Sequence, residues 1–326
     1  MSAPSTESNG YERHPELWFA DGTIILRAEN TQYRVYRGIL ERYSPNLKAA
    51  LENAPERKPV AVCPVFDLND SVLDSTPFLL ALFSPEFLPS KITQWNHLCQ
   101  VRGCLRLAHK YQVNYFRRKT LSLLTLEYPL TLEARDEIDL FAGWRSEDHG
   151  VHKLYMLALA REVGALWLLP TILHDIYLIL TELGFGELDQ LSDFGHFSPT
   201  TIAADDAKAI VTNMGDHFHG AVQILSFLGS PAHIKGCTTP DCCPLLRFQN
   251  IGYAMTAIEI MRDRPLDVWS KTDWKRLNLC QTCLKTLKKN HQSARQDFWN
   301  KLPGRYGLPG WKELKEMAAA AGVDAK

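Results

Sequence analysis

The sequence predicts a mixed α+β N-terminal domain followed by a longer, mostly all-α C-terminal region. Short runs in which apolar and polar residues alternate occur only before Asp67, whereas helical spacing of apolar residues dominates beyond Pro129. The chain has 326 residues, and a single hydrophobic core rarely grows beyond roughly 250–300 residues. These observations together favour about two domains.

The N-terminal elements follow from turn residues and apolar spacing. Two β-rich runs separated by a polar link at Glu29–Thr31 indicate a hairpin. Leu40, Leu47 and Leu51 recur at near-helical spacing and predict the helix that follows. The predicted order is a hairpin of Thr23–Arg27 and Gln32–Tyr36, a helix from Ile39 to Asn53, a strand from Val60 to Asp67, a helix that begins after Thr76 with Pro77 in its first turn and closes at Pro85, and two helices between Gln94 and Tyr128.

Helical patterns continue through the C-terminal region, separated by segments rich in Gly, Asp, Ser and Pro. The most apolar stretch, Ala165–Leu180, contains Pro170, His174 and Asp175 and is too short for a membrane span, so it predicts a buried helix. The expected helices are Leu132–Trp144, His152–Val163, Leu168–Leu183 and Thr201–Leu228, and the expected loops are Gly184–Pro199 and Gly229–Pro244.

Composition excludes several function classes. With 45% hydrophobic and 22% charged residues, the chain is typical of a globular protein. A formal net charge of -1 gives no reason to expect binding to nucleic acid or to an anionic membrane. The polar N-terminus has neither the apolar stretch of a secretory signal nor an Arg-rich transit pattern. We therefore expect the protein in the cytoplasm or the nucleus.

Four segments occur in the order in which a known family has them. They are DGTIIL from Asp21, YRVYRGILERYSP from Tyr33, CPVFDLND from Cys63 and LRLAHKYQVNYFRRKTLSLL from Leu105. Through them the region from Pro15 to Pro129 resembles a BTB/POZ domain, and it is most similar to those of BTB-containing proteins from mushroom-forming fungi. The segment from Leu279, LCQTCLKTLKKNHQSARQDFWNKLPGRYGLPGW, is similar to the tail that accompanies the domain there.

The resemblance implies a domain organisation and a mode of self-association. We expect a flexible tail over residues 1–14, a BTB/POZ-like domain over 15–130 in which helices pack on a short hairpin and a strand, and a helical region over 131–326. The family pairs through its N-terminal segment and first helix, which implies a homodimer. Leu17, Trp18 and Phe19 form an apolar cluster expected to precede the first strand. One chain should bury this cluster poorly, so we place it at the dimer interface.

Three positions depart from the family pattern. Tyr36 stands where the family usually has a histidine, Leu47 where an aromatic residue is common, and Phe83 where a tyrosine is usual. All three are compatible with a packed interior. The resemblance implies a scaffold that binds itself and another protein, here of unknown identity, with no membrane and no small-molecule substrate. It also allows a cullin ubiquitin-ligase adaptor, although no cullin-contact signature follows the third predicted strand.

Motifs for catalysis are absent from the sequence, which has no nucleophile elbow, phosphate-binding glycine loop or metalloprotease histidine pair. We therefore expect no enzyme activity. His217 and His219 in GDHFHG are candidate metal ligands. Their alternation is typical of a strand or loop, however, and no matching carboxylate cluster lies near them in the sequence, so we do not expect them to bind a metal ion. Four carboxylates lie in polar runs typical of solvated helix faces: Glu137, Asp139, Glu147 and Asp148.

The eight cysteines fall into two groups. Three lie in apolar stretches of the BTB/POZ-like region and are expected to be buried thiols: Cys63, Cys99 and Cys104. The other five form two half-sites, CTTPDCC and a C-x-x-C, which is the pattern that a tetrahedral zinc ion requires. We predict one structural zinc ion bound by Cys237, Cys242, Cys280 and Cys283. Exchange of Cys242 for its neighbour Cys243 leaves the hypothesis intact, and unmetallated thiols or a redox pair remain alternatives.

The segment Lys271–Lys301 has a local excess of positive charge, with eight basic residues against Asp273 and Asp297. Four aromatic residues are interleaved with them: Trp269, Trp274, Phe298 and Trp299. This combination permits a zinc-dependent nucleic-acid-binding regulator as an alternative function. Tryptophans at irregular spacing more often anchor a core, so we interpret the segment as a solvated basic helix face.

Overall fold

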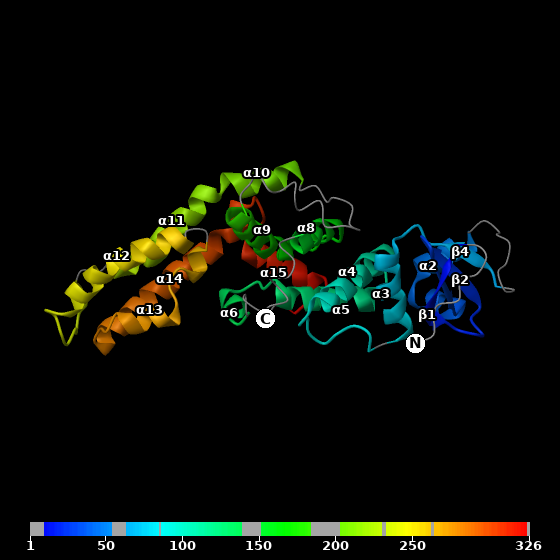
Figure 1. Cartoon of the computed structure of the whole chain (residues 1–326), viewed down its shortest axis with the longest axis horizontal. Coiled ribbons are helices and arrows are strands. Elements are labelled where there is room, and N and C mark those ends of the chain that lie inside the picture. Colours follow the sequence, from blue (N-terminus) through cyan, green and yellow to red (C-terminus); the bar gives the residue numbers. More distant parts are fainter. Residues whose placement is uncertain are drawn as a thin grey trace.

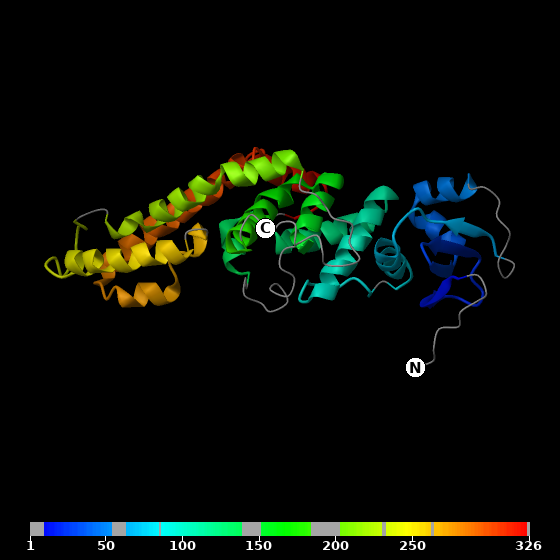
Figure 2. The ribbon, with the colours of Figure 1, turned by 45° about the horizontal axis from the view of Figure 1, so that its top comes forward.

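The computed structural model describes residues 10–53, 63–84, 86–138, 151–183, 203–229, 233–261 and 264–324 of the 326-residue chain. The molecule is elongated, with a small β-sheet at one end and a group of long helices at the other (Figure 1). A second view, turned by 45°, shows the same separation of the two ends (Figure 2). The mixed α/β N-terminal part and the mostly helical remainder agree with the predicted fold class.

A four-stranded mixed sheet occupies the N-terminal end. Its strands are β1 (Glu12–Trp18), β2 (Ile24–Ala28), β3 (Thr31–Val35) and β4 (Val65–Asp67), in the spatial order β1-β3-β2-β4. Strands β2 and β3 form the predicted antiparallel hairpin, in which Ala28 pairs with Thr31. Strand β1 lies parallel to β3, and β4 lies parallel to β2. Strands β1 and β4 are therefore the two edges of the sheet.

Strand β1 corrects two expectations about the N-terminus. It begins at Glu12, inside the segment 1–14 that the sequence assigned to a flexible tail, and it includes Leu17 and Trp18, which were expected to precede the first strand. The reason is long-range pairing, because Glu12 and Arg13 lie opposite Thr31 and Gln32 of β3. Only the complete sheet supplies this partner.

Five helices complete the N-terminal part. They are α1 (Arg37–Tyr43), α2 (Pro45–Glu52), α3 (Val72–Phe83), α4 (Trp95–Lys110) and α5 (Asn114–Glu127). The single helix predicted from Ile39 to Asn53 is in fact α1 and α2. Ser44 separates them, and its side chain accepts a hydrogen bond from the Leu47 N–H at 2.9 Å. Pro45 begins the second helix, where its fixed φ and missing N–H are tolerated.

Helix α3 begins earlier than predicted. Ser71 caps it by accepting a hydrogen bond from the Asp74 N–H, so Pro77 lies inside the helix rather than in its first turn. Because proline has no N–H, the carbonyl group of Leu73 lacks its usual helical donor. Helix α4 crosses α3 here, and Gly103 of α4 packs against this carbonyl group. The paired helices α4 and α5 agree with the prediction.

The remaining elements are almost entirely helical. They are α6 (Leu132–Asp136), α8 (Val151–Glu162), η1 (Leu166–Leu168), α9 (Leu169–Leu183), α10 (Ala204–Thr212), α11 (Met214–Leu225), η4 (Ser226–Leu228), α12 (Cys243–Met261), η5 (Pro265–Asp267), α13 (Lys271–Arg276), α14 (Gln281–Arg305) and α15 (Trp311–Ala320). We call the group α11–α14 the arm, which forms the end of the molecule farthest from the sheet (Figure 1).

Several predicted boundaries change in the helical region. The helices expected over His152–Val163 and Leu168–Leu183 agree with α8 and α9 to within a residue. The helix expected over Thr201–Leu228 is α10, α11 and η4, with a break at Asn213. Helix α6 ends at Asp136, and residues 139–144 of the helix predicted there lie outside the described residues, as does the predicted loop 184–199.

The hydrophobic core continues across the predicted boundary at residue 130. A single cluster of buried side chains extends from Leu17 in β1 to Val323 near the C-terminus. Polar contacts also cross this boundary: Arg106 of α4 lies 3.0 Å from both Asp74 of α3 and Glu162 of α8. The two regions therefore share one core. Among the described residues, no helix combines the length and the apolar character needed to cross a membrane.

Candidate metal centre

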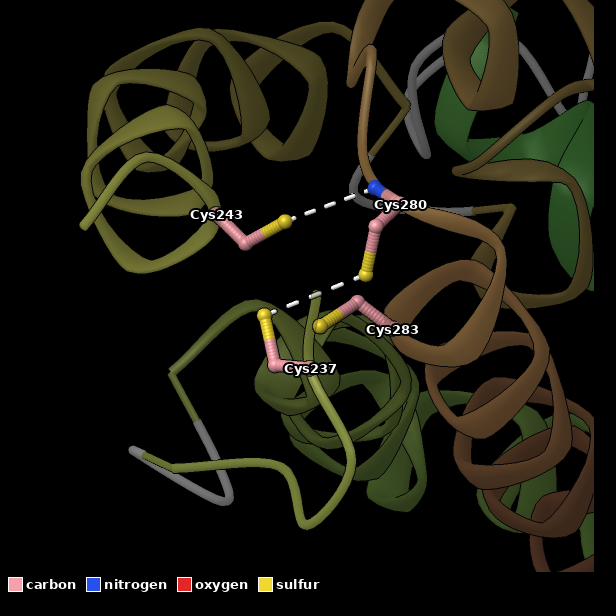
Figure 3. Close-up of side chains that lie close together, drawn as sticks. All are labelled: Cys237, Cys243, Cys280 and Cys283. Carbon is pink, nitrogen blue, oxygen red and sulfur yellow. Dashed lines mark hydrogen bonds between the residues drawn. The ribbon is translucent and has the colours of Figure 1, made fainter. Parts of the chain in front are cut away.

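Four cysteines from two distant segments meet in the arm. Cys237 lies in the loop that follows η4, and Cys243 is the first residue of α12. Cys280 immediately precedes α14, and Cys283 lies in its first turn. Figure 3 shows their four sulfur atoms directed toward one common point. The two half-sites predicted from the sequence therefore lie together.

The distances suit four thiolates around a single ion. The four sulfur atoms all lie within 4.8 Å of one another, and the Sγ atoms of Cys280 and Cys237 are 3.8 Å apart. A tetrahedral ion with metal–sulfur bonds of about 2.3 Å places its sulfur ligands about 3.8 Å from each other. A disulfide requires about 2.05 Å, and all eight cysteines are free thiols. The cluster is compatible with a bound metal ion.

Local backbone structure directs the first half-site. Gly236 immediately precedes Cys237 and has a φ of 81°, a left-handed conformation that glycine adopts without a steric penalty. The Thr239 carbonyl group accepts hydrogen bonds from the N–H groups of Cys242 and Cys243 at 3.1 and 3.0 Å, which forms the turn into α12. The Thr239 hydroxyl group lies 2.9 Å from the Cys243 sulfur. This turn brings Cys243 to the cluster.

The second half-site uses the start of a helix. Asn278 has a φ of 45°, and asparagine is one of the few residues that tolerate this left-handed conformation. The chain then reaches Cys280, whose N–H donates to the Cys243 sulfur at 3.4 Å. The positive end of the α14 helix dipole lies at Cys280 and Cys283, which favours negatively charged sulfur atoms there.

Hydrogen bonds and burial act on the thiols in opposite directions. The pKa of Cys280 is lowered to about 5, because the backbone N–H groups of Cys283 and Thr238 hydrogen-bond to its sulfur. Burial raises the pKa of the Cys283 thiol. Cys280 is therefore readily available as a thiolate, whereas a positive ion beside Cys283 would offset the effect of burial on its thiol.

A small cavity adjoins the cluster. Its volume is about 10 Å³, and its lining includes Cys237, Cys243, Cys283 and Arg247. About one water-sized sphere fits into such a space. Arg247 lies one turn after Cys243 in α12 and is 4% exposed. Its positive charge would partly offset the negative charge of four thiolates.

The cluster corrects one predicted ligand, because Cys243 and not Cys242 joins Cys237, Cys280 and Cys283. Cys242 is exposed, whereas Cys243 is 1% exposed. Successive helical residues point about 100° apart, so at the start of α12 only one of the two neighbours faces α14. The first half-site is therefore C-x5-C rather than the predicted C-x4-C.

The structure separates the histidines that the sequence considered as ligands. His217 and His219 lie in helix α11, not in the strand or loop that their alternation indicated. His217 is fully buried, whereas His219 is exposed and lies 2.8 Å from Gln223. Among the described residues, the cysteine cluster is the one group of potential ligands close enough to hold a metal ion. Of the four carboxylates considered, Asp139, Glu147 and Asp148 lie outside the described residues.

The cysteines of the N-terminal part lie apart from the cluster. Cys63 and Cys104 are buried as predicted, and Cys99 is half-buried in α4. Burial raises the pKa of the Cys104 thiol to about 12, so it remains protonated. These findings agree with structural, unreactive thiols.

The predicted dimer-interface residues differ in their accessibility. Leu17 is fully buried in the core of its own chain, which corrects the expectation that one chain buries the cluster poorly. Trp18 is half-buried over Ile25, Cys63 and Val65, with the Arg13 guanidinium 4.5 Å from its ring centroid. Phe19 is half-buried too, so Trp18 and Phe19 keep surface that a partner could contact.

The three departures from the family pattern all lie around Phe19 or in the core. Tyr36 and Phe83 pack on the Phe19 ring, with centroids at 5.0 and 5.6 Å. The Tyr36 hydroxyl group donates a hydrogen bond to Asp21 at 2.6 Å. Leu47 is 1% exposed. Leu47 therefore lies in the packed interior, as predicted, whereas Tyr36 and Phe83 are half-buried.

The basic segment has exposed charges and buried aromatic rings. Seven of its eight basic residues are exposed: Lys271, Lys275, Arg276, Lys285, Lys288, Lys289 and Lys301. The eighth, Arg295, is buried and pairs with Asp136 through two hydrogen bonds of 2.6 and 2.8 Å. Trp269, Phe298 and Trp299 are at most 5% exposed. They anchor the core, as the sequence favoured, and are not available for stacking on bases.

A groove that the sequence did not predict runs between α6, η5, α13 and α14. Its volume is about 730 Å³. Arg135 of α6 donates two hydrogen bonds to the Asp267 carboxylate of η5, and Arg295 of α14 donates two to the Asp136 carboxylate. These partners lie far apart in the sequence and carry no motif, so only the folded chain reveals them.

Comparison of the chain with protein-family models, with curated proteins and with solved structures found no match.

Proposed function

We propose that this chain is an oligomerising protein-interaction protein in which a BTB/POZ-like N-terminal domain pairs with a second copy and one zinc ion fixes the helical arm. The observation that carries the proposal is the order of elements: hairpin β2–β3, helices α1 and α2, strand β4, helix α3, then the pair α4 and α5. This is the order that the resemblance implies.

Two surface features support pairing through the N-terminal domain. Trp18 lies at the end of the edge strand β1 and keeps part of its ring exposed. Tyr43, the last residue of α1, is 45% exposed. Large aromatic side chains are enriched in the centres of protein interfaces. These two residues therefore mark the surface at which we expect the second copy.

Zinc is the metal that the cysteine cluster favours. Four thiolates form a soft, tetrahedral ligand set, which zinc accepts and hard cations such as magnesium do not. Four protein ligands leave no open position for a substrate or a reacting water, so the site is structural rather than catalytic. A bound ion would connect the loop after η4 with the starts of α12 and α14.

Nucleic-acid binding is the second candidate, favoured by seven exposed basic residues on α13 and α14. Its weakness is that three of the four interleaved aromatic rings are buried. Salt-sensitive binding of duplex DNA by the full chain would support it.

Light scattering on the full chain tests the leading proposal. At tens of micromolar, a concentration at which even weak complexes form, we expect the mass of a dimer or larger. Trp18→Asp and Tyr43→Asp should each lower the oligomer fraction. Leu126→Asp provides the control, because Leu126 is 65% exposed near the end of α5, whereas Phe116 at the start of α5 is the residue that packs on Tyr43. A monomer at every concentration would contradict the proposal.

A further inference from the structure

Helix α12 presents an apolar face to solvent. Leu245, Phe248 and Met255 are 55%, 72% and 52% exposed, and Gly252 lies between the last two on the same face. Their spacing of three, four and three residues places them along one side of the helix. The opposite side, which includes Cys243 and Ala254, is buried against the rest of the arm.

From Cys243 to Thr256 this face carries no charge. Its exposed flanking residues are Gln249 and Thr256, and the charged residue found between Cys243 and Thr256 is Arg247, which is 4% exposed and on the opposite side. A solvent-facing helix side normally carries charged residues. An uncharged face with a 72% exposed phenylalanine is typical of a surface that another protein covers.

Gly252 independently supports a face that another molecule covers. It lies in the middle of a 19-residue helix, where glycine costs about 1 kcal/mol relative to alanine. A Cβ atom at this position would meet nothing within 4 Å, so packing within this chain does not require glycine. A glycine on an exposed helix face allows the side chain of another molecule to approach the backbone closely.

We propose that α12 pairs in antiparallel orientation with α12 of a second copy. Leu245 and Met255 are equally distant in sequence from Asn250, and so are Phe248 and Gly252. A two-fold axis at the level of Asn250 therefore places each Phe248 ring over Gly252 of the other copy, and each Leu245 beside its Met255. Large side chains face small ones, and the 3-4-3 spacing is that of an antiparallel coiled-coil seam.

This pairing is separate from the proposed N-terminal interface. The arm lies at the end of the molecule farthest from the sheet, so both surfaces are accessible in the same chain (Figure 2). Four side-chain layers form a small interface compared with the roughly 800 Å² per partner of stable complexes. We expect a dissociation constant on the order of 10 μM.

Charge exchange across the proposed seam provides the test. Sedimentation velocity is measured on the full chain carrying Trp18→Asp, which weakens the N-terminal contribution. Adding Leu245→Glu or Met255→Lys alone should weaken self-association roughly tenfold or more, because each places an unpaired charge in the seam. An equimolar mixture of the two variants, and the variant with both substitutions in one chain, should regain association, since residue 245 then faces residue 255 with opposite charge.

Leu126→Glu is the matched control, since Leu126 is an exposed leucine of α5. Both seam positions are more than half exposed, so circular dichroism should show unchanged helix content. The proposal is overturned if a single charge leaves association unchanged, if the mixture and the double variant do not recover, or if Leu126→Glu has the same effect. Loss of all association by Trp18→Asp alone would also overturn it, while leaving the N-terminal dimer supported.

Discussion

The side chain of His217 lies inside a layer of aromatic rings that joins α9, α11 and α14. Its ring stacks on Tyr177 at a centroid distance of 3.9 Å and on His174 at 5.1 Å, and it meets Phe298 edge-on at a centroid distance of 5.6 Å. Burial, with smaller contributions from the neighbouring His174 and Arg305, lowers the pKa of His217 to about 2. The pKa of His174 is also lowered well below its ordinary value, mainly by burial. Both histidines are therefore neutral core residues.

The neutral state of His217 predicts acid sensitivity. The unfolded chain protonates this histidine at its ordinary pKa of 6.5, whereas the folded chain resists protonation down to about 2. The unfolded state thus binds more protons than the folded state below pH 6.5. As the pH falls below this value, the free energy of unfolding should decrease by roughly 1.4 kcal/mol per pH unit for this group. His217→Gln should reduce the slope of unfolding free energy against pH, measured by urea unfolding between about pH 7 and 5. His219→Gln, on the exposed side of α11, should leave it unchanged.

The adjacent residues Cys242 and Cys243 offer a sharper test of the metal site. Cys243→Ser should remove bound zinc, because its sulfur belongs to the cluster. Cys242→Ser should retain about one zinc ion per chain, as expected for a single four-thiolate site. Elemental analysis of the purified full chain distinguishes the two variants. Equal zinc content in both, or none in the unsubstituted chain purified with zinc present, would exclude this site.

Residue spacing predicted the two half-sites but not which neighbour binds. The usual half-site gap favoured C-x4-C and so Cys242, but the choice depends on where α12 begins. That start is determined by the turn at Thr239, whose carbonyl group accepts hydrogen bonds from the N–H groups of Cys242 and Cys243. A sequence pattern does not resolve a helix start to one residue, and one residue rotates a side chain by about 100°.

At the scale of elements, the crossing of α3 and α4 depends on a proline and a glycine. Pro77 leaves the Leu73 carbonyl group without a helical donor, and Gly103 of α4 lies against that group. A Cβ atom on Gly103 would lie 2.7 Å from the Leu73 oxygen and 3.1 Å from the Asp74 Cα. The backbones of the two helices therefore approach too closely for any side chain at this position.

Gly103→Ala should consequently destabilise the protein, although alanine favours helix formation. We expect a loss of about 1–3 kcal/mol in unfolding free energy, since backbone atoms must move to accept the methyl group. Gly304→Ala is the matched control: it lies in α14, where a Cβ atom would meet nothing within 4 Å. This second change should be neutral or stabilise by up to about 1 kcal/mol. Denaturant unfolding checks both, and equal effects would show that the crossing tolerates a side chain.

Elements formed by local signals were predictable, and those formed by distant partners were not. The β2–β3 hairpin and the pair α4 and α5 agree with turn residues and apolar spacing. Strand β1 was not predicted, because it pairs in parallel with β3, and β2 lies between these two strands in the sequence. The burial of Leu17 was missed for the same reason, since this side chain is buried only once β1 joins the sheet. Its apolar character alone could not distinguish a core position from an interface.

At the scale of the whole molecule, contacts between distant segments hold the two regions together. Trp167 of η1 donates a hydrogen bond to Thr125 of α5 at 3.0 Å, and Arg117 of α5 donates to the Val163 carbonyl group at 3.1 Å. Helix α15 packs on η1. The last helix of the chain is therefore coupled through η1 to the N-terminal domain. Composition could predict about two domains, but not that they share one core.

This shared core predicts that damage at the C-terminus reaches the N-terminal domain. Leu314 of α15 is fully buried, and Leu314→Ala should cost roughly 2–5 kcal/mol through the cavity that it leaves. Hydrogen exchange measured by mass spectrometry on the full chain should then become faster not only in α15 and η1 but also in α5. Lys312→Ala, at an exposed position of the same helix, should leave all three protected. Faster exchange confined to α15 and η1 would mean that the regions open independently, and that the continuous core does not couple them.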